Sequence, residues 1–199
     1  MFIETFSIAF FSILILEMGD KTQLIVLSIT TKYKDQKLAI LSGFFFAILF
    51  VSFAAVILGT IIKEIIPNEF IRFIGASLFL FVGIYAMIDW YNDKKHENEN
   101  DELNRSRFTF SSTFRSVLVQ TFLLIFMMEL GDKSQIFIIT LATQVTDLIA
   151  VVLGATLGMT MLALVAIITG DIILKIIPES FIKLVSGVLF IVIGIIMFF

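Results

Sequence analysis

Long apolar runs separated by short polar stretches set the pattern of this chain. Splitting the sequence at its charged residues and its two prolines gives six apolar segments, at residues 3–30, 38–62, 69–90, 114–143, 147–173 and 179–199. Each is long enough to cross about 30 Å of hydrocarbon as a helix that rises about 1.5 Å per residue. The segments lack the period-two alternation of barrel strands and are much longer than the 9–11 or so residues that such a strand needs. The pattern therefore predicts an all-α integral membrane protein with six transmembrane helices.

The composition excludes several kinds of site. Hydrophobic residues make up 59% of the 199 residues, above the roughly 45–50% of soluble domains. The chain has no cysteine, which excludes disulfides, thiolate metal sites and thiol nucleophiles. Its single histidine, His96, lies in a hydrophilic stretch, where we expect it to be solvated. Any metal site in the apolar segments must therefore be built from oxygen donors or methionine.

The two halves of the chain repeat one another. Glu17 corresponds to Glu129 at an offset of 112, and Pro67 corresponds to Pro178 at an offset of 111. Each half then holds three helices, and because three is odd, the second half must enter the membrane in the opposite sense. We expect two inverted three-helix repeats at residues 1–91 and 114–199, joined by a polar, flexible linker at residues 92–113.

Basic residues are distributed unevenly over the connections between these segments. Of the twelve Lys and Arg residues outside the two repeated motifs described below, ten flank the first, third and fifth connections. Only Lys63 and Arg72 flank the second, and the fourth has none. Because cytoplasmic loops carry the excess of Lys and Arg, this bias places the central linker in the cytoplasm and both termini outside.

One charged motif interrupts an apolar segment in each half. The first copy consists of Glu17, Met18, Gly19, Asp20, Lys21, Thr22 and Gln23. The second copy consists of Glu129, Leu130, Gly131, Asp132, Lys133, Ser134 and Gln135. An ionisable group at the bilayer centre costs at least about 2.5–3.5 kcal/mol, so two such clusters indicate a functional site. The alternative is that the acids only pair with the neighbouring lysines to neutralise charge within a helix bundle.

The motifs supply the donors of a hard-cation site. On a helix, Glu17 and Asp20 share one face, as do Glu129 and Asp132, and the inverted repeat brings the two faces together near the midplane. Carboxylates suit calcium, magnesium or manganese and disfavour zinc and copper. Secondary oxygen donors are Thr22, Gln23, Ser134 and Gln135.

The remaining motif residues have expected roles of their own. Gly19 and Gly131 remove a side chain between the acids, which permits either a close helix approach or a local break. Lys21 and Lys133 either face the site as counterions or extend toward the interface.

Charge counting indicates a mechanism of exchange. Four carboxylates and two lysines sum to −2 when all are ionised, and one divalent cation neutralises that charge. Two protons on the carboxylates do the same, since closely spaced acids in a low dielectric bind protons readily. The hypothesis is that one metal ion moves one way while protons return on the same groups. Sodium coupling meets the same charge requirement.

At this point the sequence resembles a known family. Each motif has the order acid, apolar residue, glycine, aspartate, basic residue, hydroxyl residue. One such motif per three-helix repeat, with a polar loop between the repeats, resembles the pattern of the GDT-type calcium/manganese cation exchangers. The resemblance covers nearly the whole chain and implies metal binding by Glu17, Asp20, Glu129 and Asp132. It also implies export of Mn²⁺ or Ca²⁺ from the cytoplasm against protons, and the short form resembles prokaryotic members, which favours manganese and the inner membrane.

Together these observations predict a secondary active transporter rather than an enzyme. We expect alternating access around one carboxylate site, with Mn²⁺ or Ca²⁺ as transported substrate, H⁺ as counter-ion, no resident cofactor and no nucleic-acid partner. The alternatives left open are a Ca²⁺/H⁺ exchanger, Na⁺-coupled exchange, a passive divalent-cation channel and an intramembrane hydrolase. The sequence also leaves open whether the chain forms a homodimer.

Overall fold

The part of the chain that the structure describes is almost entirely helical, without strands. The computed structural model describes residues 1–18, 20–95 and 113–169, together with residues 184, 187, 188, 191, 192 and 194–196 near the C-terminus. Its elements are α1 (Phe2–Glu17), α2 (Lys21–Lys32), η1 (Lys34–Gln36), α3 (Lys37–Ile65), α4 (Asn68–Lys95), α5 (Phe114–Glu129), α6 (Lys133–Gln144) and α7 (Leu148–Thr169). Gly19, His96 and the rest of the linker to residue 112, and most of the last predicted span, lie outside the described residues.

Two or three segments among the described residues are long and apolar enough to cross a membrane. Two of them have the necessary length and composition: α7, and the stretch Lys34–Ile65 that contains α3. A third span is formed if α5 and α6, bent by 71° relative to each other, are taken together. The described residues therefore show an all-helical protein with two to three membrane-capable segments.

The motif-bearing segments are broken helices. α1 ends at Glu17 and α2 begins at Lys21, while α5 ends at Glu129 and α6 begins at Lys133. The residues after the two glutamates are both extended, with φ −60° and ψ 117° at Met18 and φ −65° and ψ 110° at Leu130. Of the two outcomes that the sequence left open, a close helix approach or a local break, the structure shows a local break in both motif-bearing segments.

Gly131 occupies a backbone conformation that explains its place in the break. Its φ is +86°, in the left-handed region that a side chain with a Cβ disfavours. A Cβ built at this position would meet nothing within 4 Å, so space does not account for the glycine. The backbone conformation alone requires it.

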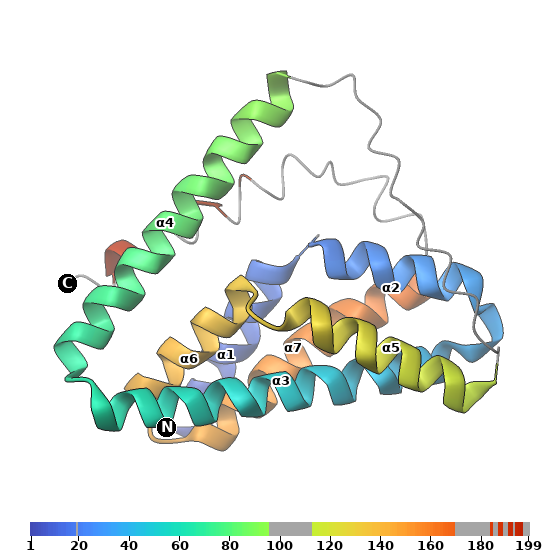
Figure 1. The fold of residues 1–199 in the computed structure, drawn as a ribbon, viewed down its shortest axis with the longest axis horizontal. Helices are drawn as coiled ribbons and strands as arrows, with labels where there is room; N and C mark the ends of the chain where they lie inside the picture. The colour runs from blue at the N-terminus through green and yellow to red at the C-terminus, as the bar shows by residue number, and fades with distance from the viewer. Residues whose placement is uncertain are drawn as a thin grey trace.

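The helix packing is reciprocal between the two halves. α1 packs along α7, and α5 packs along α3, which runs along the lower edge of the bundle in Figure 1. A Cβ at Gly43 of α3 would lie 2.5 Å from the carbonyl oxygen of Leu118, and one at Gly154 of α7 would lie 2.6 Å from that of Phe6. Both pairs of residues are related by the sequence repeat, at offsets of 111 and 112. Two equivalent close approaches therefore hold the broken helices against the long ones.

The core lies mainly between these helices, α4 contributes Phe79 to it, and the C-terminal end of α4 extends away from it. Buried apolar side chains of the core include Ile13 of α1, Ile48 of α3, Ile125 of α5 and Val151 of α7. α4 rises at an angle from the bundle, so that its C-terminal end stands apart from the other helices (Figure 1). The two helix breaks lie next to each other, since side chains of one motif form hydrogen bonds with side chains of the other.

Candidate metal centre

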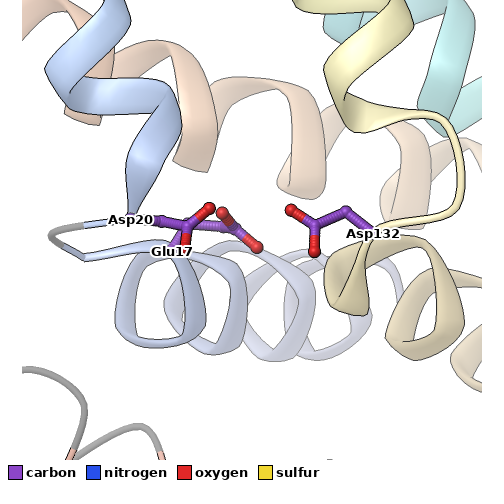
Figure 2. Close-up of side chains that lie close together, drawn as sticks. All are labelled: Glu17, Asp20 and Asp132. Atoms are coloured by element: carbon purple, nitrogen blue, oxygen red, sulfur yellow. The ribbon is translucent and has the colours of Figure 1, made fainter. Parts of the chain in front are cut away.

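Carboxylates from both helix breaks meet in one place. One carboxylate oxygen each from Glu17, Asp20 and Asp132 lies within 4.8 Å of the other two. Figure 2 shows Asp132 pointing toward the two acids of the first motif from the opposite side. Residues that are 112 or more positions apart in sequence are thus brought together by the paired breaks.

Glu17 is the most deeply placed of the three. Its side chain is 3% exposed, and both carboxylate oxygens lack a hydrogen-bond partner among the described residues. A buried carboxylate that lacks hydrogen bonds and a counter-charge is energetically costly. Native structures avoid it unless a cation or water binds the group or a proton neutralises it. The arrangement fits a cation that takes its oxygens from Glu17, Asp20 and Asp132.

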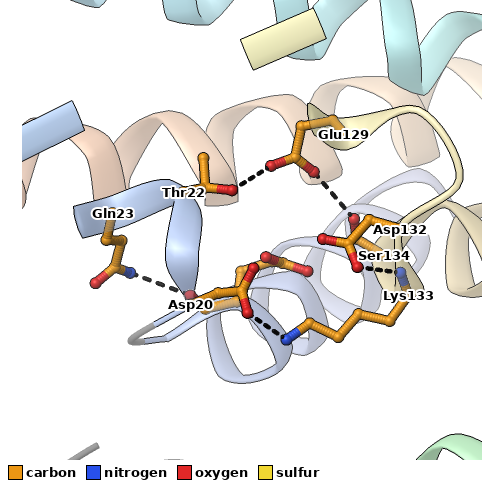
Figure 3. A network of polar contacts seen from close by, with 8 residues as sticks. Asp20, Thr22, Gln23, Glu129, Asp132, Lys133 and Ser134 are labelled. Atoms are coloured by element: carbon orange, nitrogen blue, oxygen red, sulfur yellow. Dashed lines mark hydrogen bonds and ion pairs between the residues drawn. The ribbon is translucent and has the colours of Figure 1, made fainter. Parts of the chain in front are cut away.

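Glu129, the fourth acid, is held by hydroxyl groups. Its side chain is fully buried, and its Oε1 accepts a hydrogen bond of 2.7 Å from the hydroxyl of Thr22. Its Oε2 accepts a longer hydrogen bond of 3.5 Å from the hydroxyl of Ser134 (Figure 3). The structure therefore brings three of the four predicted acids into one cluster and places the fourth beside it.

Lys133 crosses from the second motif to the first. Its Nζ donates a hydrogen bond of 2.9 Å to Oδ1 of Asp20, and the two side chains are 21% and 20% exposed. Its backbone N–H donates to Oδ1 of Asp132 at 2.7 Å, so that Asp132 caps the start of α6. The side chain of Lys21, the equivalent residue of the first motif, is not among the described side chains.

The side chains of Gln23 and Gln135 form hydrogen bonds with backbone groups at the helix breaks. The side-chain amide of Gln23 donates to the carbonyl oxygen of Glu17 at 3.1 Å. The side-chain oxygen of Gln135 accepts from the backbone N–H of Gly131 at 2.7 Å. A break leaves backbone groups without intrahelical partners; Gln135 supplies one for the N–H of Gly131, and Gln23 joins the backbone N–H of Asp20 in donating to the carbonyl oxygen of Glu17.

Two cavities adjoin the carboxylates, and Thr22 lines both. A recess of about 340 Å³ is lined by Asp20, Thr22, Met128, Leu130, Gly131, Asp132 and Lys133. A small cavity of about 10 Å³ behind Glu17 is lined by Glu17, Thr22, Gln23, Val26, Phe44, Met159, Leu162 and Ala163. The larger recess gives Asp20 and Asp132 contact with solvent, whereas Glu17 faces the small cavity.

Met159 is a site neighbour that sequence reasoning did not find. Met18 and Met127, which lie in or beside the motifs, are 48% and 66% exposed. Met159 of α7 is 4% exposed and lines the small cavity together with Glu17. Nothing in the motifs indicates this neighbour, because it depends on the packing of α1 against α7.

Comparison with known proteins shows that a family profile covers both motifs. The family profile described as "Divalent cation/proton antiporter GDT1" matches residues 5–94 and 117–199, which include both motifs. The chain is similar to "GDT1-like protein 3" of Arabidopsis thaliana, with 29% identity over 92% of this chain and 66% of the relative. It is also similar to "GDT1-like protein 4" of Oryza sativa subsp. indica, with 28% identity over 89% of this chain and 67% of the relative.

A bacterial relative matches over more of its own length. The "Putative manganese exporter" of Vibrio cholerae is 27% identical over 92% of this chain and 85% of the relative. The chain spans about two thirds of the length of the plant relatives. No solved structure matches the chain.

Proposed function

Because the chain belongs to the divalent cation/proton antiporter GDT1 family, we propose that it exports a divalent cation from the cytoplasm in exchange for protons. Mn²⁺ is the proposed substrate, since the bacterial relative carries the name of a manganese exporter. The family is one of transporters rather than enzymes, and the apolar helices agree with a membrane protein. The proposed place is the inner membrane, with both termini outside and the central linker in the cytoplasm.

The convergence of carboxylates from both breaks carries this proposal. Oxygens of Glu17, Asp20 and Asp132 lie within 4.8 Å of one another, and those of Glu17 are buried without a described partner. Three carboxylates around one point suit a hard divalent cation. We assign these three as ligands in the described arrangement, with Glu129 as the fourth acid of the site.

The same acids account for exchange. When the cation leaves, the clustered carboxylates repel one another in a poorly solvated setting, and protons neutralise them. Protons and metal then occupy the same oxygens in turn, which links their movements without a second site. The recess beside Asp20 and Asp132 is the proposed route by which ions reach the site in this conformation.

Reciprocal packing supports an inverted-repeat architecture. The contacts at Gly43 and Gly154 are related by the sequence repeat, as are the two breaks. In the proposed arrangement, residues 1–91 and 114–199 are two inverted three-helix repeats joined by residues 92–113, and alternating access is a movement of one repeat against the other. Gly19 and Gly131 are the proposed hinges.

The other motif residues have supporting roles in this proposal. Thr22 and Ser134 hold Glu129, while Gln23 and Gln135 stabilise the backbone at the breaks. The positive charges of Lys21 and Lys133 offset part of the negative charge of the four acids. None of these six needs to coordinate the cation directly in the described arrangement.

Transport by purified protein in liposomes tests the proposal. Movement of Mn²⁺ and Ca²⁺ is followed together with internal pH, for the native chain and for Asp20→Asn and Asp132→Asn. An imposed proton gradient is expected to drive Mn²⁺ uphill in the native chain and in neither variant. Asp35→Asn is the matched control, because this exposed carboxylate lies in η1, outside the site.

The alternatives give different results in the same assay. Faster proton-driven Ca²⁺ than Mn²⁺ movement would identify a Ca²⁺/H⁺ exchanger. Uphill movement that needs a sodium gradient would identify Na⁺ coupling, and purely downhill movement without a pH signal would identify a channel. Transport that survives in both Asp variants would refute the assigned site.

A further inference from the structure

Lys133 holds one of the three clustered carboxylates with its ammonium group. Its Nζ lies 2.9 Å from Oδ1 of Asp20, and the carboxylate of Asp20 is also in the cluster with Glu17 and Asp132. We propose that Lys133 is a built-in competitor of the transported ion, which occupies Asp20 in the metal-free site and is displaced when a divalent cation binds. This inference rests on the proposed function and adds a residue that sets the ion selectivity of the same site.

The geometry of the site makes the Lys133 ammonium and a bound divalent cation compete for the carboxylate of Asp20. A divalent cation held by these acids must lie about 2.0–2.6 Å from the carboxylate oxygens, depending on the size of the ion. The ammonium already lies at hydrogen-bonding distance from an oxygen of Asp20 (Figure 3). If the Lys133 ammonium and the cation shared that carboxylate, they would be only a few Å apart, where like charges repel strongly even near a protein surface.

Displacement requires only the side chain to move. The backbone of Lys133 is fixed at the start of α6, where its N–H donates to Asp132 at 2.7 Å. Its side chain lines the recess of about 340 Å³ and is 21% exposed, so water is directly accessible to it. A lysine ammonium is compact, strongly hydrated and carried on a flexible stem, which suits exchange between a carboxylate and solvent.

Competition by an ammonium favours divalent over monovalent ions. A monovalent cation that replaces the ammonium substitutes one unit charge for another and gains no additional attraction to the acids. A divalent cation gains the attraction of a second unit charge. Lys133 thus increases the free-energy cost of binding any cation at the site. A monovalent cation does not recover this cost, whereas a divalent cation does, so the lysine contributes to selectivity by disfavouring monovalent ions.

Displacement also releases a link between the two halves. The ion pair joins the first residue of α6 to the residue that precedes α2, across 113 positions of sequence. Cation binding therefore removes one contact between the breaks while the carboxylates on both sides gain a shared ion.

Amine labelling of the full chain in detergent tests displacement directly. The rate at which a small amine-reactive acylating reagent modifies Lys133 is measured by mass spectrometry, with and without saturating Mn²⁺ at one fixed pH. We expect Mn²⁺ to increase labelling of Lys133 several-fold and to leave that of Lys34, an exposed lysine in η1, unchanged. Mn²⁺ binding with unchanged or reduced labelling of Lys133 would overturn the inference.

The absence of native cysteine allows a second test that separates the charge from the shape of the side chain. Lys133→Cys is modified either with an aminoethyl methanethiosulfonate, which restores an ammonium, or with a propyl methanethiosulfonate, which adds a neutral chain of similar length. The neutral adduct is expected to bind Mn²⁺ about tenfold or more tightly and to let 100 mM or so Na⁺ weaken that binding, as removal of a nearby unit charge implies. The ammonium adduct is expected to restore native affinity and indifference to Na⁺.

The outcomes separate this inference from the function on which it rests. Equal Mn²⁺ affinity and equal Na⁺ sensitivity of the two adducts would refute competition by the ammonium while leaving the antiporter proposal intact. Failure of the native chain to bind Mn²⁺ or Ca²⁺ would instead refute the proposed function, and the inference with it. Because both adducts come from one purified variant, a folding defect would affect them equally and leave their comparison valid.

Discussion

The hydroxyl of Thr22 in the first motif donates a hydrogen bond of 2.7 Å to Oε1 of Glu129 in the second. Both side chains are buried, and 107 positions of sequence separate them. With the ion pair between Lys133 and Asp20, this bond makes a second polar link between the two breaks. The two contacts run in opposite directions, since one hydrogen donor comes from each motif.

Thr22→Val is expected to destabilise the protein by leaving Oε1 of Glu129 without that donor. Valine keeps nearly the shape of threonine but lacks the hydroxyl, so the buried oxygen loses its short hydrogen bond. We expect the free energy of unfolding to fall by about 1–3 kcal/mol, measured as a lower thermal unfolding midpoint in detergent. Proton-driven Mn²⁺ transport is expected to fall as well.

Two further variants control the Thr22 experiment. Thr22→Ser retains the hydroxyl and is expected to preserve most of the stability. Thr30→Val removes a buried hydroxyl of the same helix that donates only to the carbonyl oxygen of Val26, one turn earlier, and is expected to leave transport unchanged. If Thr22→Val, like Thr30→Val, left Mn²⁺ transport unchanged, the hydrogen bond to Glu129 would not be needed for transport.

Glu17→Gln is expected to separate stability from metal binding. The two oxygens of Glu17 are buried without a described partner, so replacing the carboxyl group with a neutral amide removes an ionisable group that is costly to bury. In the presence of a chelator, the thermal midpoint of the variant is expected to equal or exceed that of the native chain. Mn²⁺ at 100 times its dissociation constant stabilises a native protein by about 2.7 kcal/mol, and the variant is expected to lose this gain.

Glu64→Gln supplies the comparison for that measurement. Glu64 is exposed near the end of α3, away from the carboxylate cluster, so Mn²⁺ should stabilise this variant as it does the native chain. A normal Mn²⁺-dependent rise in the midpoint of Glu17→Gln would show that Glu17 is not a ligand.

Gly131→Ala is expected to have a conformational cost without a steric one. The φ of +86° disfavours any residue with a Cβ by about 1–2 kcal/mol, while a Cβ would meet no atom within 4 Å. Gly131→Asn is expected to cost less, because asparagine tolerates the left-handed region better than alanine. Thermal midpoints of the two variants in detergent give the comparison, and equal losses would contradict a backbone origin.

Gly43→Ala and Gly154→Ala are expected to be more damaging than Gly131→Ala, and similar to each other. Their new Cβ atoms would lie 2.5 and 2.6 Å from backbone carbonyl oxygens, which side-chain rotation cannot relieve. Overpacking of this kind costs about 1–3 kcal/mol or more. At Gly158 the nearest atom is 2.9 Å away, so Gly158→Ala is expected to lose less stability in the same thermal measurement. A large effect at Gly43 with none at Gly154 would contradict the reciprocal packing.

The sequence by itself determined the class of protein, its family and the location of the charged motifs. Long apolar runs predict helices whatever their neighbours are, and the high cost of a charge in hydrocarbon marks Glu17, Asp20, Glu129 and Asp132 as significant. The repeated motif carried the family resemblance, which the match over residues 5–94 and 117–199 confirms. The class of protein and the location of the motifs depend on composition and spacing, the family on the resemblance of the motif, and none of them needs knowledge of contacts.

Only the tertiary structure decided how two nearly identical motifs differ. Thr22 bonds to the glutamate of the other motif, whereas its equivalent Ser134 contacts Glu129 in its own motif. Lys133 reaches Asp20 across the bundle. These differences arise because side-chain partners are selected by the packing of segments more than 100 positions apart, and the same seven-residue pattern offers several ways to satisfy its polar groups. The repeat fixes which residues are equivalent, while the surrounding helices determine what each of them contacts.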